Sequence, residues 1–172
     1  MAKPDRVYWD ACTWIAYINE ERETPKSNGT VENRYAMCRS VLEQAQNGEV
    51  EIATSAFTLA EVCKSEKAKN ENLGKLQGFL DHEFILVVQL DKNIGVKAQQ
   101  IQLSGLSGIK PPDAVHLASA QLANVTEFHS FDDRRLEKDG QINAEGGHAI
   151  KCCKPGENNL KDTLFDPQNE DD

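Results

Sequence analysis

The stretch FILVVQL, residues 84–90, constrains the fold more than any other segment because it is an almost unbroken apolar run. Such a run is typical of a strand in a parallel sheet that helices cover on both faces. Other strand-like segments alternate with segments of helical spacing, which favours an α/β fold with a parallel sheet. The expected strands span residues 6–10, 50–55, 84–90, 126–130 and 148–153.

Apolar residues at helical spacing separate these strands. The first helix is expected to begin shortly after Cys12, and Ser55 is expected to cap the helix after the second strand. Residues 23–30, ETPKSNGT, are rich in turn-forming residues. Other helices are expected over residues 31–46, 56–67, 70–81, 91–105 and 132–138, with a further helix from Asp113 onward.

Length and charge limit the classes of protein that fit. A chain of 172 residues with 39% hydrophobic residues suits one core, so we expect a single domain over residues 1–153 and an acidic tail over residues 154–172. The formal net charge of −9 argues against a broad basic surface that holds nucleic acid by neutralising its phosphates. Any contact with nucleic acid should therefore be local or mediated by a metal ion.

The sequence shows no signal segment and no apolar run near the roughly 20 residues that a membrane-spanning helix needs. We therefore expect a cytoplasmic protein without membrane contact. Its five cysteines include no C-x-x-C pair, which favours reduced and mostly buried thiols over disulfides or a zinc site.

Acidic residues follow the predicted strands at the edge where sites of open parallel sheets form. Asp10 ends the first strand, Glu61 lies on the helix after the second, and Asp113 opens the helix before the fourth. Asp132 and Asp133 follow the fourth strand. Because the carboxyl ends of parallel strands share one edge, the fold should bring these acids together.

Each of these acids also has a purely structural interpretation. Asp113 follows two prolines and could simply stabilise the first turn of a helix, and Asp132 could be a helix cap. Glu61 could be solvated, although apolar neighbours surround it. Asp10 is the hardest to explain in this way, because a carboxylate within VYWDACTWI is expected to be buried, and a buried charge needs a partner.

Several converging carboxylates repel one another, and a hard divalent cation relieves that repulsion. Oxygen ligands suit Mg²⁺ or Mn²⁺ better than zinc. A cation of this kind can activate water and stabilise a leaving oxygen, so hydrolysis of a phosphodiester is the natural chemistry. The cation would also supply the positive charge that the acidic chain lacks.

Four motifs in this order resemble the PIN-domain nucleases, which include the VapC-type toxins of bacterial toxin-antitoxin pairs. The motifs are VYWDACTWIAYI, TSAFTLAEVCKS, PPDAVHLASA and HSFDDRRL, and the resemblance extends over roughly residues 5–153. It implies a three-layer α/β/α sandwich around a five-stranded parallel sheet. It also implies an endoribonuclease that depends on Mg²⁺ or Mn²⁺ and leaves a 5′-phosphate and a 3′-hydroxyl.

The resemblance assigns catalysis and metal binding to four positions: Asp10, Glu61, Asp113 and Asp132. Asp133 is the alternate for the last of these. The family places a hydroxyl residue two positions before the fourth acid, and Ser130 stands there. The family often has Ser or Asn two positions after the first aspartate, where this chain has Cys12, so Thr13 is the candidate for hydroxyl support.

Other residues near the motifs are open to two interpretations. His116, one turn after Asp113, is expected to be a packed or hydrogen-bonded helix residue more than a ligand. Arg134 and Arg135 are either contacts for the substrate phosphate or solvated charges, and Lys110 is expected to be solvated. Trp9 and Trp14 are expected to pack in the core.

The sequence thus predicts a PIN-like endoribonuclease that acts on RNA, with a cognate antitoxin and a homodimer as possible partnerships by analogy. One alternative is a PIN-like module that binds RNA or protein without catalysis. A second is a receiver-like domain that binds Mg²⁺ and accepts a phosphoryl group. The second alternative fits poorly, because that class usually pairs two acids after the first strand and Asp10 has no acidic neighbour.

Overall fold

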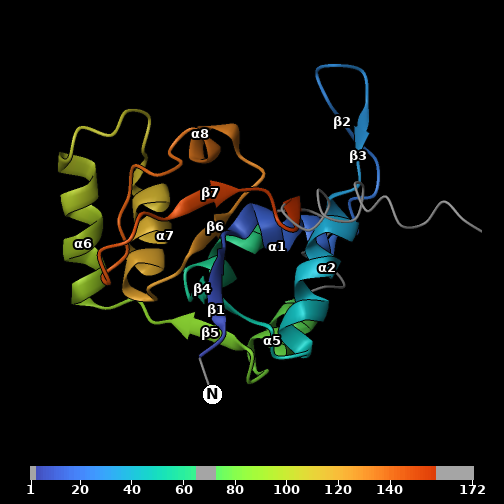
Figure 1. Ribbon diagram of the computed structural model, residues 1–172, viewed down its shortest axis with the longest axis horizontal. Helices are drawn as coiled ribbons and strands as arrows, with labels where there is room; N and C mark the ends of the chain where they lie inside the picture. The colour runs from blue at the N-terminus through green and yellow to red at the C-terminus, as the bar shows by residue number, and fades with distance from the viewer. Residues whose placement is uncertain (1–2, 65–72, 158–172) are drawn as a thin grey trace, which may run out of the picture.

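The computed structural model describes residues 3–64 and 73–157 and contains one five-stranded parallel sheet (Figure 1). The strand order is β5-β4-β1-β6-β7, so the first strand lies at the centre. This architecture confirms the predicted α/β class and the five expected strands. Their bounds are β1 Asp5–Trp9, β4 Val50–Ser55, β5 Ile85–Val88, β6 Glu127–His129 and β7 Lys151–Cys153.

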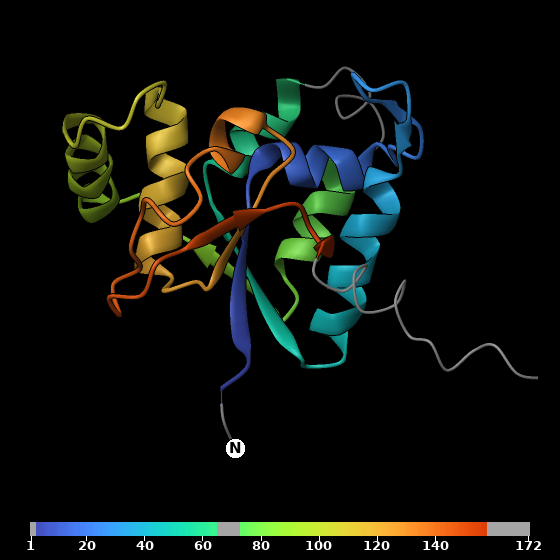
Figure 2. The ribbon, with the colours of Figure 1, turned by 45° about the horizontal axis from the view of Figure 1, so that its top comes forward.

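Helices cover both faces of the sheet, so the predicted three-layer α/β/α sandwich is confirmed (Figures 1 and 2). On one face lie α6 (Lys92–Leu103) and α7 (Pro111–Leu122), and on the other α1 (Ala11–Ile18), α2 (Arg34–Gln46) and α5 (Leu73–Leu80). None of the helices in the described segments is long and apolar enough to cross a membrane.

The apolar strand β5 contributes to both cores, as its sequence predicts. Leu86 and Val88 pack with the core beneath α6 and α7, whereas Ile85 and Val87 pack with the core beneath α1, α2 and α5. Alternate side chains of one strand thus reach opposite layers, which explains why the strand has no polar face.

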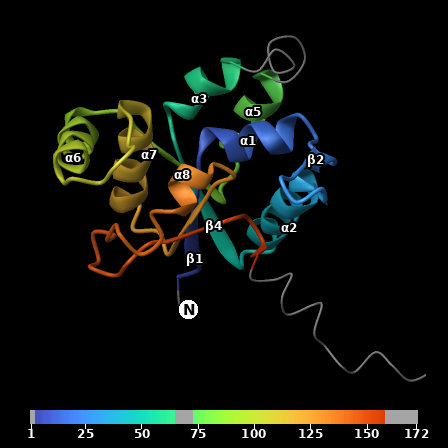
Figure 3. The same ribbon diagram turned by 90° about the horizontal axis from the view of Figure 1, so that it is seen from above.

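The central position of β1 determines where the acids lie. Strand β1 pairs in parallel with β4 on one side and with β6 on the other, so the chain leaves all three strands at one edge. Figure 3 views the molecule from this edge and shows α8 (Asp133–Leu136) between α1 and α7, with α3 (Thr58–Glu61) nearby. The loops that carry the predicted site residues therefore meet over the middle of the sheet.

The start of α2 differs from the expectation. The helix predicted over residues 31–46 begins at Arg34, because the side chain of Asn33 accepts a hydrogen bond from the Ala36 N–H and caps it. The preceding residues form a small antiparallel hairpin of β2 (Thr24–Pro25) and β3 (Val31–Glu32). Strand β2 lies in the segment predicted to be turn-rich, and β3 replaces the first residues of the predicted helix.

The helix predicted over residues 56–67 begins later than expected, at Thr58. Its described part consists of α3 and a 3₁₀ turn, η1 (Val62–Lys64). The rest of the predicted segment lies outside the described residues, as does the start of the helix predicted over residues 70–81. Ser55 is not the helix cap: it ends β4, and its hydroxyl accepts a hydrogen bond from the Phe57 N–H before the helix begins.

A buried hydroxyl joins the carboxyl ends of β1 and β4. Thr54 donates a hydrogen bond of 2.8 Å to the carbonyl oxygen of Trp9 and accepts one of 3.1 Å from the indole N–H of Trp14. Both tryptophans are fully buried, which confirms that they pack in the core. The strand end just before Asp10 is therefore fixed by side-chain contacts as well as by the sheet.

We expect Thr54→Val to lower the free energy of unfolding by about 1–3 kcal/mol, because the buried Trp14 N–H loses its acceptor. Urea unfolding followed by tryptophan fluorescence measures this loss. Thr30→Val, in the exposed hairpin, is the matched control and should cost less than about 0.5 kcal/mol. Equal losses in the two variants would contradict this role of Thr54.

Candidate active site

Asp10 is the N-cap of α1, so the helix begins at Ala11 and not after Cys12 as the sequence suggested. Its carboxylate is fully buried. Oδ1 accepts hydrogen bonds from the Thr13 N–H at 3.0 Å, the Thr13 hydroxyl at 2.9 Å and the Cys12 thiol at 3.0 Å. Thr13 thus supplies the hydroxyl support that the sequence predicted, and Cys12 adds a thiol.

Asp113 lies in the first turn of α7, whose first two residues are Pro111 and Pro112. The two prolines suit this position because the first N–H groups of a helix have no internal partner. Oδ2 of Asp113 accepts a hydrogen bond of 3.1 Å from the backbone N–H of Lys110. The helix start thus holds one oxygen of the buried carboxylate and leaves Oδ1 directed elsewhere.

Arg135, on α8, connects these two carboxylates. Its Nη1 donates to Oδ2 of Asp10, while Nε and Nη2 donate to Oδ1 of Asp113 at 3.1 Å and 2.5 Å. Its side chain is only 9% exposed. Of the two interpretations from the sequence, the solvated charge is wrong, because Arg135 is buried and paired with both carboxylates.

Burial and ion pairing act against each other on these groups. Burial alone raises the pKa of Asp10, but Arg135, the Cys12 thiol and nearby His116 outweigh it and hold the pKa below its ordinary value of 3.8. Burial disfavours the charged guanidinium, yet Asp10 and Asp113 raise the pKa of Arg135. Burial and the negative charge of Asp10 raise the pKa of the Cys12 thiol to about 12, so the thiol stays protonated and can donate.

Glu61 is held by a second buried contact. Its Oε2 lies within hydrogen-bond distance of Nε2 of His116, whose Nδ1 is 2.8 Å from the hydroxyl of Tyr8. An ionised carboxylate only accepts hydrogen bonds, so Nε2 is the donor in this pair. His116 is therefore a buried, hydrogen-bonded helix residue, as predicted, and it also links Glu61 of α3 to the centre of the sheet.

Asp132 and Asp133 lie at the outer rim. Asp132 is the N-cap of α8 and forms an ion pair of 2.8 Å with Arg134, whose side chain is 55% exposed. The hydrogen bond from Arg134 is the main cause that lowers the pKa of Asp132. Asp133 is exposed, and Ser130 accepts a hydrogen bond of 3.0 Å from the Asp132 N–H. Asp132 is thus half-buried beside the other acids, not enclosed with them.

A different group brings metal-binding atom types closest together in the described residues: Glu127, His129 and Cys153, whose candidate atoms lie within 4.8 Å of one another. The indole N–H of Trp9, 3.2 Å away, can only donate to Nδ1 of His129. The neutral ring then carries its proton on Nε2, which donates to Glu127 at 2.8 Å. Nε2 has no free lone pair in this state, so the group fits a hydrogen-bonded pair better than a metal centre.

The fold and the buried acids at its edge define the class of protein. The sequence matches the PIN domain family over residues 7–140, so the chain belongs to that family. PIN domains are generally nucleases, and such nucleases generally use divalent metal ions. A search of curated protein sequences gave no significant match.

Two solved structures with the same fold are VapC toxins or contain one. The VapBC2 complex of Rickettsia felis, bound to a DNA fragment from its promoter, aligns with a TM-score of 0.56 and 15% identity over 87% of this chain and 99% of that one. VapC20 of Mycobacterium tuberculosis, a toxin that cleaves the sarcin-ricin loop, aligns with a TM-score of 0.53 and 12% identity over 73% of this chain and 89% of that one. These likenesses establish the fold.

Acid should weaken the fold through Asp10. Because the pKa of Asp10 is lower in the folded chain, its stabilisation is complete above the ordinary value of 3.8 and is lost as the pH falls through the lower folded value. We expect the free energy of unfolding to fall between about pH 5 and pH 2, and to fall less steeply in Asp10→Asn. Urea titrations at each pH measure both slopes, and parallel slopes would rule out this contribution.

Proposed function

We propose that this protein is a Mg²⁺- or Mn²⁺-dependent endoribonuclease that hydrolyses phosphodiester bonds of RNA. One observation carries the proposal: two buried carboxylates, Asp10 and Asp113, meet at the carboxyl edge of the sheet and share a single guanidinium. A third buried carboxylate, Glu61, approaches from α3. Burying so many acids is costly, and a purely structural domain gains little from it.

The donor atoms suit a hard divalent cation. Carboxylate oxygens would come from the buried acids Asp10, Asp113 and Glu61. A further carboxylate would come from Asp132 at the rim, with Asp133 as its alternate. That Arg135 already sits between Asp10 and Asp113 shows that this place accommodates positive charge. When bound, the divalent cation would supply a Lewis acid that activates water and offsets charge on the phosphate.

The residues around the acids would keep the carboxylates in place. Thr13 and Cys12 fix one oxygen of Asp10, and His116 fixes Glu61. Residues that orient a metal ligand in this way typically matter about 10- to 100-fold for affinity or activity. At the exposed rim, Arg134 is the candidate to contact a substrate phosphate, since its side chain is 55% exposed although it pairs with Asp132.

The biological role that we propose is the toxin of a toxin-antitoxin pair, acting in the cytoplasm. The likeness to VapBC2, a complex of two components, and to VapC20, a toxin that cleaves RNA, supports this role. A cognate antitoxin is then the expected protein partner, and a homodimer is a further proposal by analogy with such toxins. The predicted domain of residues 1–153 would carry the activity.

A PIN-like module without catalysis is the second candidate. It is favoured by one observation, the guanidinium of Arg135 that holds the two central carboxylates. Such a module would bind RNA or protein and leave RNA intact when Mn²⁺ is added. The receiver-like alternative has no comparable support, since Asp10 is flanked by Trp9 and Ala11 and not by a second acid.

The cleavage assay distinguishes the two candidates. Purified protein should cut a mixture of structured RNAs in Mg²⁺ or Mn²⁺ and stop when EDTA is added. Asp113→Asn should lower the rate at least about 100-fold, because the loss of a ligand exceeds the loss of a residue that only orients one.

Asp5→Asn, on the exposed end of β1 opposite the site, is the control and should cut at the wild-type rate. Circular dichroism verifies that both variants are folded. RNA binding without cleavage in any of these metals would favour the non-catalytic module, and full activity of Asp113→Asn would remove the acid site from the reaction.

A further inference from the structure

Arg135 donates hydrogen bonds to one oxygen of Asp10 and one oxygen of Asp113. The other oxygen of each carboxylate is bound by groups at the start of α1 or α7. Thr13 and Cys12 donate to Oδ1 of Asp10, so Oδ2 faces Arg135. The Lys110 N–H donates to Oδ2 of Asp113, so Oδ1 faces Arg135. The backbone contacts thus direct one oxygen of each acid toward a common point, and one guanidinium occupies that point.

A divalent cation bound by both acids would need these same two oxygens. The other oxygen of each carboxylate is engaged with the start of the helix that positions the residue, so using it would disturb α1 or α7. A divalent cation beside the guanidinium would also place two positive charges in a poorly solvated site, which is unfavourable. Docked arginine and bound cation are therefore alternative states of the site.

The position of Arg135 allows its side chain to leave. It belongs to the one-turn helix α8, which lies at the rim of the site between α1 and α7 (Figure 3). The side chain of Arg135 is itself 9% exposed, so it borders solvent. Because α8 lies outside the sheet, displacement of this side chain would require no movement of the strands.

We propose that Arg135 is an internal counter-ion that neutralises Asp10 and Asp113 in the metal-free protein and is displaced when a divalent cation binds. This proposal rests on the proposed function of the acid site as a metal centre. Arg135 stabilises the metal-free fold by neutralising its buried acids. It also lowers the apparent metal affinity, because only the molecules in which Arg135 is undocked can bind the cation. It is a positioning residue for the acids and not a catalytic one.

Calorimetric titration of the full chain with Mn²⁺ tests the competition. Arg135→Met removes the competing charge but keeps an apolar stem of similar length, and we expect it to bind Mn²⁺ about tenfold more tightly than the wild type. Arg135→Lys, which keeps the charge but loses the planar fork, should lie between the two. The apo form of Arg135→Met should melt below the wild type, and saturating Mn²⁺ should recover more of its melting temperature.

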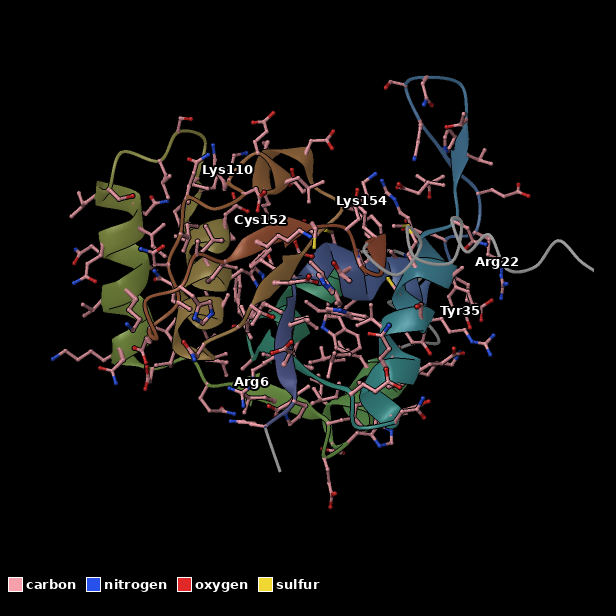
Figure 4. The ribbon with its side chains drawn as sticks, viewed as in Figure 1. Arg6, Arg22, Tyr35, Lys110, Cys152 and Lys154 are labelled. Carbon is pink, nitrogen blue, oxygen red and sulfur yellow. The ribbon has the colours of Figure 1, made fainter. Side chains whose placement is uncertain are left out.

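Arg6→Met is the matched control. Arg6 also forms a partly buried ion pair, with Glu51 at 2.5 Å, and donates to the Ala123 carbonyl, but it lies at the opposite end of β1 (Figure 4). Its loss should lower the melting temperature without changing Mn²⁺ affinity. A general effect of destabilisation on metal binding would alter both variants and would overturn the specific role of Arg135.

A measurement on the wild type follows the displacement of Arg135 directly. The Nε–H signal of Arg135 in a ¹⁵N spectrum, assigned by its absence in Arg135→Lys, should shift to a solvent-exposed position as Mg²⁺ is added. A signal that stays unchanged while calorimetry shows Mg²⁺ binding, or equal Mn²⁺ affinity of wild type and Arg135→Met, would overturn the counter-ion proposal and leave the metal centre standing. No binding of either metal to any form would overturn both.

Discussion

The buried charge of Asp10 is the constraint on which the rest of the structure depends. A carboxylate without access to water is tolerated only when donors and positive charge replace its hydration. Here the N-terminus of α1, the Thr13 hydroxyl and the Cys12 thiol supply the donors, and Arg135 supplies the charge. The same guanidinium satisfies Asp113, so one cation ties the ends of β1 and β6 to the start of α7.

The topology makes this arrangement possible. With β1 at the centre, the segments that follow β1, β4 and β6 leave the sheet side by side, although they are far apart in sequence. Bonds from Trp9 to His129 and from Thr54 to Trp9 fix these strand ends to one another. The loops can then vary in length while the acids stay over the middle of the sheet, which suits a site that must hold charges rigidly.

Much of this could be predicted from the sequence, since the acids follow recognisable patterns. Proline pairs and apolar spacing locate the start of α7 and with it Asp113, and the β-prone run before Asp10 locates the end of β1. The buried role of Arg135 could not be predicted, because the two adjacent arginines of DDRR have the same sequence surroundings. Only the tertiary fold determines that Arg135 is buried and Arg134 is exposed. The contact between His116 and Glu61 joins residues 55 positions apart and leaves no periodic trace. The hairpin β2–β3 was missed because two-residue strands are too short to show alternation.

The central claim is that the point shared by Asp10 and Asp113 is a cation site that Arg135 fills when metal is absent. Crystals grown without metal and then soaked in Mn²⁺ test it directly, through anomalous scattering at the manganese absorption edge. The account predicts an anomalous peak within bonding distance, about 2.0–2.3 Å, of Oδ2 of Asp10 and Oδ1 of Asp113, with the Arg135 side chain displaced. No peak at these acids, or a peak there with Arg135 still docked on both carboxylates, would contradict it.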